Sequence, residues 1–278
     1  MKKKWLSIPY AVWSLIFSIA PIIIIAVYSF CSRSPYGKII YDFTLDNYKQ
    51  FLEPIYLNVL WRSVVLAGKS TIICLLVAYP MAMIIARSQM KKKHILVMLF
   101  VLPLWTNFLL RTYAWMVLLR DQGVINQILI GLRLIDEPLS LLYNSGAVVL
   151  GMVYNFLPFM VLPIYSVLSK IDHSFIEAAQ DLGATSTKVF WKVIFPLSIP
   201  GVVSGLIMVF MPAVSTFVIS DLLGGGQTIL LGNLIQNQFL VARNWQFGSA
   251  ISIIMMFLIL VTMGISNKYK SEEGGELW

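Results

Sequence analysis

Charged residues are scarce in this 278-residue sequence. They make up 12% of it, whereas soluble domains carry roughly 25%. Histidine and cysteine are scarcer still, with two of each: His94, His173, Cys31 and Cys74. The four lie too far apart for a metal-ligand cluster or a disulfide framework, and neither G-x-S-x-G nor H-E-x-x-H occurs. We therefore expect no bound metal ion and no catalytic site.

Long apolar runs take up most of the sequence. Hydrophobic residues make up 58% of it, and the net charge is +8. A positive charge can indicate nucleic-acid binding, but here the basic residues do not gather on a soluble segment. Lysine and arginine beside apolar runs are typical of a membrane surface with anionic lipids. The composition predicts a protein embedded in a lipid bilayer, with no nucleic-acid partner.

Six apolar runs are long enough to cross a membrane as helices. The first follows Lys2-Lys3-Lys4 and exceeds the roughly 7–15 apolar residues of a signal peptide, so we expect it to stay uncleaved. The sequence predicts an all-α membrane protein, with residues 1–278 as a single transmembrane domain. We place its spans at about 8–30, 63–86, 95–119, 146–168, 199–220 and 248–266.

The basic residues predict an orientation. Six spans put both termini on one side, together with residues 87–93 and 169–198, and this side carries most of the lysines. Segments rich in lysine and arginine face the cytoplasm. We therefore expect both termini and the 169–198 loop to be cytoplasmic.

Prolines lie inside five of the six expected spans. An interior proline frees a backbone carbonyl and bends a helix, which lipid tolerates only where neighbours or cavity water satisfy the freed group. Proline is also generally commoner in membrane helices than in soluble ones. The pattern indicates bent helices around a pathway: Pro21, Pro80, Pro103, Pro158, Pro163 and Pro212.

The loop at 169–198 has its own pattern. Apolar residues recur at three- and four-residue intervals before Gly183, which predicts a short amphipathic helix with one apolar face: Ile171, Phe175, Ala178, Ala179 and Leu182. We place Glu177 in the first turn of this helix. Gly183 then permits a sharp turn. A second short amphipathic segment, residues 189–194, is expected to stop at Pro196. Two helices joined at a glycine could form a docking surface or an ordinary interfacial loop.

The loop resembles the EAA loop of permease subunits of binding-protein-dependent ATP-binding-cassette (ABC) importers, E-A-A-x3-G-x9-I-x-L-P. Val193 and Phe195 replace the Ile and Leu of that pattern, and the other motif positions are identical: Glu177, Ala178, Ala179, Gly183 and Pro196. The resemblance implies the MetI-like permease fold. It also implies that the loop is a coupling helix seated in a groove of a separate ATPase subunit. The coupling residues would be Glu177, Ala178, Ala179, Asp181 and Gly183.

The resemblance also implies partners. They are a second homologous permease subunit, a dimer of ATPase subunits that binds ATP and Mg, and an extracellular or periplasmic substrate-binding protein, all at a bacterial cytoplasmic membrane. This chain is expected to bind no cofactor. Gly68-Lys69-Ser70-Thr71 matches half of a phosphate-binding loop, but Ser63 stands at its first glycine position and the stretch lies inside an apolar span.

Further stretches resemble permease subunits of spermidine/putrescine importers: residues 43–48, 102–115, 157–163, 220–226, 231–233 and 244–248. Importers of aminoethylphosphonate or iron share much of this pattern, so the cargo stays open between them. A stand-alone secondary transporter is a further alternative, but it would need an internal repeat and ionisable groups deep in the membrane, and we find neither.

A polyamine needs carboxylates and aromatic faces for its ammonium groups. The candidates along the pathway are Trp105, Tyr113, Trp115 and Asp221. The aromatic residues fit an interfacial belt or core packing equally well. No acid lies deep in any span, so most carboxylates would come from the partner permease and the binding protein.

Overall fold

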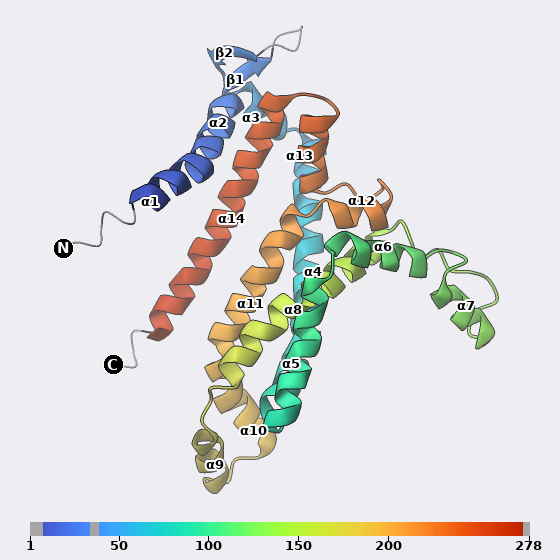
Figure 1. Ribbon diagram of the computed structural model, residues 1–278, viewed down its shortest axis with the longest axis vertical. Coiled ribbons are helices and arrows are strands. Elements are labelled where there is room, and N and C mark those ends of the chain that lie inside the picture. Colours follow the sequence, from blue (N-terminus) through green and yellow to red (C-terminus); the bar gives the residue numbers. More distant parts are fainter. Residues whose placement is uncertain (1–7, 34–38, 275–278) are drawn as a thin grey trace.

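The computed structural model describes residues 8–33 and 39–274, and most of these are helical (Figure 1). In chain order the elements, with η marking π-helical segments, are α1 (Ile8–Ser14), η2 (Leu15–Ile19), α2 (Ala20–Ser29), β1 (Cys31–Arg33), β2 (Ile39–Phe43), α3 (Asp46–Phe51), α4 (Pro54–Arg87), α5 (Met90–Trp105), α6 (Phe108–Leu118), α7 (Val124–Gly131), α8 (Ser145–Leu168), α9 (His173–Asp181), α10 (Ser186–Val189), η3 (Phe190–Ile194), α11 (Phe195–Ser215), α12 (Val218–Gly224), α13 (Leu231–Leu240) and α14 (Trp245–Gly274).

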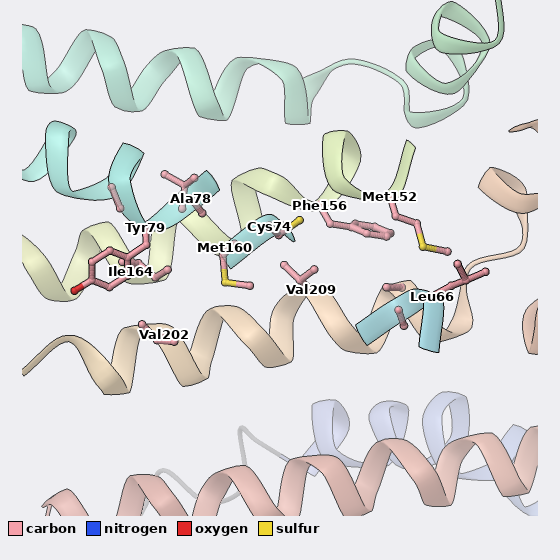
Figure 2. Close-up of a cluster of buried hydrophobic side chains, with 14 of the residues drawn as sticks. Leu66, Cys74, Ala78, Tyr79, Met152, Phe156, Met160, Ile164, Val202 and Val209 are labelled. Carbon is pink, nitrogen blue, oxygen red and sulfur yellow. The ribbon is translucent and has the colours of Figure 1, made fainter. Parts of the chain in front are cut away.

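Helices α4, α8 and α11 form the packed centre of the molecule. Figure 2 shows aliphatic, aromatic and sulfur-containing side chains from the three helices meeting there. Fully buried members include Ala78 of α4, Met160 of α8 and Val209 of α11. Among them, Tyr79 is the polar exception, and its hydroxyl lies 2.8 Å from the Ser198 hydroxyl of α11. Burial of these faces against one another fixes the three helices as one unit.

Two glycines let α11 approach α8 closely. A Cβ on Gly205 would lie 2.6 Å from the sulfur and 3.2 Å from the carbonyl oxygen of Met160, and a Cβ on Gly201 would lie 3.0 Å from the Pro163 carbonyl. Small residues allow this kind of backbone approach, which replaces the missing hydrophobic driving force between helices in lipid. The α8–α11 contact therefore depends on these glycines.

The chain ends lie outside this centre. Helix α14 packs against α2 and α13, while the antiparallel β1–β2 hairpin lies beside the start of α14 (Figure 1). A second buried cluster joins α3, α13 and α14 through Phe51, Leu231, Phe247 and Ile251. The Ser63 hydroxyl of α4 accepts from the Leu231 N–H at 2.7 Å, which ties this cluster to the central unit.

Five helical segments of the described chain are long and apolar enough to cross a membrane, and a bent pair brings the number to six. The segments are Val12–Ser29, Pro54–Arg87, Ser145–Leu168, Ser186–Ser215 and Trp245–Gly264, with the pair Lys92–Trp105 and Phe108–Leu118. The chain is therefore a multi-pass membrane protein. Residues 1–7 of the expected cytoplasmic N-terminus and residues 275–278 lie outside the described residues.

The third expected span, 95–119, differs from the structure. It is two helices, α5 and α6, bent by 93° at Thr106 and Asn107. Thr106 ends α5, with its hydroxyl donating to the Pro103 carbonyl at 2.7 Å. Asn107 begins α6, because its side chain accepts from the Leu109 N–H at 2.8 Å. The run 95–119 is apolar on average, so its hydropathy did not predict the N-cap at Asn107 in its middle.

The fifth expected span, 199–220, also has different ends. The helix does not stop at Pro196, because α10, η3 and α11 form one continuous segment, Ser186–Ser215, with Pro196 inside it. The π-helical segment η3 directly before Pro196 is the kind of local adjustment that satisfies backbone groups freed by an interior proline. At its other end α11 stops at Ser215, and residues 218–220 already belong to α12. The second loop segment is thus the first part of a long helix.

Candidate functional site

Helix α9 begins at a side-chain cap. The Asp172 carboxylate accepts from the Ser174 N–H at 3.0 Å. This backbone hydrogen bond is the main cause that lowers the pKa of Asp172 below its usual 3.8. The cap satisfies one of the free N–H groups at the helix start and fixes where α9 begins.

Gly183 ends α9 in a Schellman motif. Its φ is +79°, in the left-handed region that glycine adopts without strain. The Ala184 N–H donates to the Ala179 carbonyl at 3.0 Å, and the Gly183 N–H donates to the Gln180 carbonyl at 2.8 Å. The expected sharp turn at Gly183 is present, and it sends the chain from α9 toward α10.

The acidic residues of α9 lie away from its first turn. Glu177 is the fifth residue of the helix, so its expected place in the first turn was wrong. Its carboxylate lies 3.7 Å from Nδ1 of His173, and both side chains are exposed. Asp181 is the last residue of α9, where a negative charge opposes the helix dipole by about 0.3–1 kcal/mol. These two acids therefore add little to the stability of the fold.

The expected apolar face of α9 divides into two groups. Ile171 and Ala179 pack against the central core, together with Ile176, which the sequence pattern did not include. The other residues of the expected face are exposed at the tip, with Phe175 at 56% and Leu182 at 89%, and Ala178 beside them. We call Phe175, Ala178 and Leu182 the tip surface. Its apolar side chains have no cover in the described part of the chain.

The second half of the loop connects the tip to the core. Val189 and Ile194 are buried. The Phe190 ring meets Tyr79 of α4 edge to face, with centroids 5.8 Å apart. The sequence placed Phe190 in the expected second segment but did not indicate its partner Tyr79, which lies in an apolar run and carries no pattern of its own. Phe190 thus contacts α4, and Tyr79 in turn contacts Ser198 of α11.

A cavity of about 730 Å³ lies between α9, η3 and the ends of α4 and α8. Its lining includes Arg87, Ile176, Gln180 and Phe190. The loop therefore touches the core at some points and leaves space at others.

The candidate pathway residues do not form one cluster. Trp105 ends α5 and is 85% exposed, and Tyr113 is 45% exposed on α6. Trp115 is half-buried and meets Tyr154 of α8 edge to face at 5.4 Å. Asp221 lies on α12, which packs against α6. Within the described residues, no hydrogen bond or ring contact joins one of the four to another.

Asp221 belongs to a polar network that sequence reasoning did not find. Its carboxylate accepts from the Asn233 side chain at 2.5 Å. Asn233 is 3% exposed, and its amide oxygen also accepts from the Ser220 hydroxyl at 2.6 Å and from the Leu230 N–H at 2.9 Å. Asn233 thus holds α12 against α13. The Gly-Asn pair at 232–233 was the available signal, since an asparagine in an apolar segment must find partners.

The remaining motif, Gly68-Lys69-Ser70-Thr71, lies within α4. The Thr71 hydroxyl donates to the Ala67 carbonyl at 2.7 Å, as in a continuous helix. Among the described residues, no group of three or more His, Cys, Asp or Glu side chains could hold a metal ion.

Comparisons with known proteins agree with this architecture. The model of the family described as "Binding-protein-dependent transport system inner membrane component" matches residues 1–269. The spermidine/putrescine transport system permease protein PotB of Haemophilus influenzae is 39% identical over 259 residues, which are 92% of this chain and 91% of that protein.

Two solved structures share the fold at low sequence identity. A chain of a bacterial ABC transporter involved in the import of the acidic polysaccharide alginate has a TM-score of 0.78 at 17% identity and covers 96% of both chains. A chain of the MetNI methionine ABC transporter has a TM-score of 0.57 at 16% identity and covers 78% of this chain and 96% of its own. The family match covers nearly the whole sequence, and the chain belongs to the inner membrane components of binding-protein-dependent transport systems, as a transport subunit rather than an enzyme.

Proposed function

We propose that this chain is one of the two permease subunits of an ATP-driven polyamine importer and forms half of its translocation pathway. The observation that supports a polyamine as the cargo is the 39% identity to PotB over 92% of the chain. Structural neighbours at 16–17% identity support only the fold. Aminoethylphosphonate and iron are the competing cargoes.

The pathway proposal places the cargo near α6 and α12. Trp105, Tyr113 and Trp115 supply aromatic faces for ammonium groups, and Asp221 supplies a carboxylate. Asn233 positions that carboxylate, since its amide holds Asp221 at 2.5 Å. One acid balances one ammonium group, so the partner permease and the binding protein supply the other carboxylates.

The coupling proposal rests on α9. Glu177, Ala178, Ala179, Asp181 and Gly183 are the coupling residues, and the exposed tip surface contacts the ATPase subunit. Two features support this: Leu182 is 89% exposed, and Glu177 and Asp181 add little to folding. The Phe190–Tyr79 contact then links the ATPase to the transmembrane core.

The proposed assembly holds a PotC-like second permease, a dimer of PotA-like ATPase subunits and a PotD-like binding protein. ATP and Mg bind to the ATPase, and this chain binds no cofactor. Residues 1–278 form one permease domain with six spans in the bacterial cytoplasmic membrane. The loop at about 169–198 and both termini face the cytoplasm.

Uptake by the reconstituted complex tests the cargo. Labelled spermidine and putrescine should enter proteoliposomes in an ATP-dependent manner, and unlabelled aminoethylphosphonate or ferric ion in excess should not compete. Binding of either compound, with no uptake of polyamine, would mean that the cargo is not a polyamine and would leave the coupling proposal unaffected.

Asp221→Asn tests the pathway carboxylate. It keeps the size of the side chain and should raise KM for spermidine, while Asp136→Asn, at an exposed acid on the outer side, is the control.

Accessibility tests the orientation. Single cysteines at Lys92 and Thr185 should react with a membrane-impermeant reagent only from the cytoplasmic side. Those at Asp136 and at the exposed Gln227, near Gly225, should react only from outside. Labelling of Thr185 from outside would overturn both the orientation and the coupling role of the loop.

A further inference from the structure

Lys69 is a cation inside the apolar helix α4, and neither the fold nor the proposed function requires a positive charge there. It is exposed near the middle of α4, and it has no hydrogen-bond or ion-pair partner among the described residues. The next two residues, Ser70 and Thr71, are buried, and the Ser70 hydroxyl donates to the Met152 sulfur of α8 at 3.4 Å. An ionisable side chain within a span is costly unless it has a counter-charge or reaches the interface. The residues around Lys69 therefore indicate which kind of anion would compensate its charge.

Lys69 lines a groove of about 360 Å³ between α4 and the start of α8. The other lining residues are mostly aliphatic: Leu66, Ile72, Ile73 and Val149, together with Ser145 and Gly146. The groove thus has one positive charge at one place and hydrocarbon elsewhere. A ligand that fits it has an anionic head and an aliphatic body.

The start of α8 adds donors at the charged part of the groove. The Asn144 side chain caps α8 by accepting from the Ala147 N–H at 2.9 Å. This leaves the N–H groups of Ser145 and Gly146, which have no partner within the helix. Free N–H groups at a helix start favour an anion. They reinforce Lys69 rather than form a site by themselves.

The aliphatic surface continues along α4 from Ile72, inside the groove, to Leu76 beyond it. Ile72 is 58% exposed and Leu76 is 68% exposed, one turn further along the helix. Lys69 lies beside Ser145 and Gly146, where the candidate span Ser145–Leu168 begins. A lysine side chain at that depth reaches the head-group region. A phosphate at Lys69 would therefore continue into an acyl chain along Ile72 and Leu76.

We propose that this groove, which we call the Lys69 groove, binds an anionic phospholipid. Its phosphate contacts the Lys69 ammonium and the start of α8, and one acyl chain lies against Ile72, Ile73 and Leu76. The single uncompensated positive charge favours a lipid with a net negative head group over a zwitterionic one. The proposal depends only on membrane embedding, so it stands or falls separately from the cargo and the coupling loop.

Native mass spectrometry of the full-length chain in detergent tests the proposal. Phosphatidylglycerol should bind in preference to phosphatidylcholine of the same acyl composition. Lys69→Gln should weaken phosphatidylglycerol binding about tenfold, the value of one charge-assisted hydrogen bond to phosphate. Lys69→Arg should keep it, and Lys49→Gln, which removes an exposed lysine outside the groove, should leave it unchanged.

A second variant acts through shape instead of charge. Ile72→Trp adds bulk at a side chain that is already 58% exposed, so the fold should tolerate it while lipid binding falls. Inorganic phosphate in excess should not displace phosphatidylglycerol, and displacement would mean a small-anion site and contradict the lipid. Equal binding by wild type and Lys69→Gln, or equal loss in Lys49→Gln, would overturn the proposal.

Discussion

The α8 helix and the α9 helix are neighbours in sequence and opposites in burial. Eleven of the 24 residues of α8 are buried inside the chain, whereas no residue of α9 is buried. In α8 the apolar side chains meet α4 and α11, but in α9 Phe175 and Leu182 stay uncovered. The difference separates two tasks: α8 holds the fold together, and α9 presents a surface that other contacts must cover.

The largest expected effect on stability is at the buried contact between α8 and α11. Gly205→Leu should lower the free energy of unfolding by about 1–3 kcal/mol, because its Cβ would lie 2.6 Å from the Met160 sulfur and 3.2 Å from the Met160 backbone carbonyl oxygen. Gly68→Leu is the control, since no atom lies within 4 Å of a Cβ there. It should be neutral or stabilising by up to about 1 kcal/mol. Denaturation in detergent measures both, and equal destabilisation would mean that α11 does not pack on α8 as described.

A smaller effect separates the two tryptophans. Trp115→Ala should destabilise the chain by about 1 kcal/mol or more, because it loses the edge-to-face contact with Tyr154. Trp105→Ala, at a side chain 85% exposed, should change stability by less than about 0.5 kcal/mol. If both tryptophans contact cargo, both variants should raise KM for spermidine despite this difference. A rise in neither would remove them from the pathway.

At the end of α9, Gly183→Ala should cost about 1 kcal/mol, because alanine is strained at a φ of +79°. No atom lies within 4 Å of the added Cβ, so sterics outside the backbone contribute nothing. Gly183→Asn is the matched variant, since asparagine tolerates the left-handed region better. Hydrogen exchange of the Ala184 amide should increase in the alanine variant more than in the asparagine one. The reverse order would contradict the Schellman cap.

The smallest effect is the pH dependence of the α9 cap. Because the pKa of Asp172 is lowered in the folded protein, the cap contributes fully above the usual value of 3.8 and is lost as the pH falls through the lower folded value. Exchange of the Ser174 amide should therefore accelerate, relative to Asp172→Asn, only in this acidic window. Asparagine caps without a charge and should show no such window. Identical pH profiles would mean that Asp172 does not cap α9.

The apolar runs predicted where most helices lie, because a span must be long and uncharged to satisfy its backbone in lipid. They did not predict the 93° break at Thr106 and Asn107. Hydropathy is averaged over a window of residues, and one polar residue, the N-cap Asn107, barely changes that average. The sequence also did not predict that α10, η3 and α11 are continuous, because Pro196 resembled a helix stop and instead lies inside the segment Ser186–Ser215.

The sequence predicted those residues of the candidate site whose role depends on their neighbours in sequence, and it did not predict those that act through distant partners. Gly183 was found because its role is a backbone angle set by neighbouring residues. Tyr79 and Asn233 act through partners more than ten residues away, the Ser198 hydroxyl and the Ser220 hydroxyl, and such pairings appear only when the helices are packed. The sequence pattern did not include Ile176, and it did not say that Phe175 is exposed, because the helix period alone does not say which face the core will cover.

The central proposal is that α9 couples this chain to an ATPase while adding little to its fold. Glu177→Lys tests it directly, because the Glu177 side chain is exposed and its only ion pair among the described residues is with the exposed His173. The variant should reach the membrane at normal levels and lose ATPase co-purification and spermidine uptake together, while Asp136→Lys on the outer side keeps both. Normal uptake with Glu177→Lys, or a loss of uptake explained wholly by a loss of protein, would contradict the account.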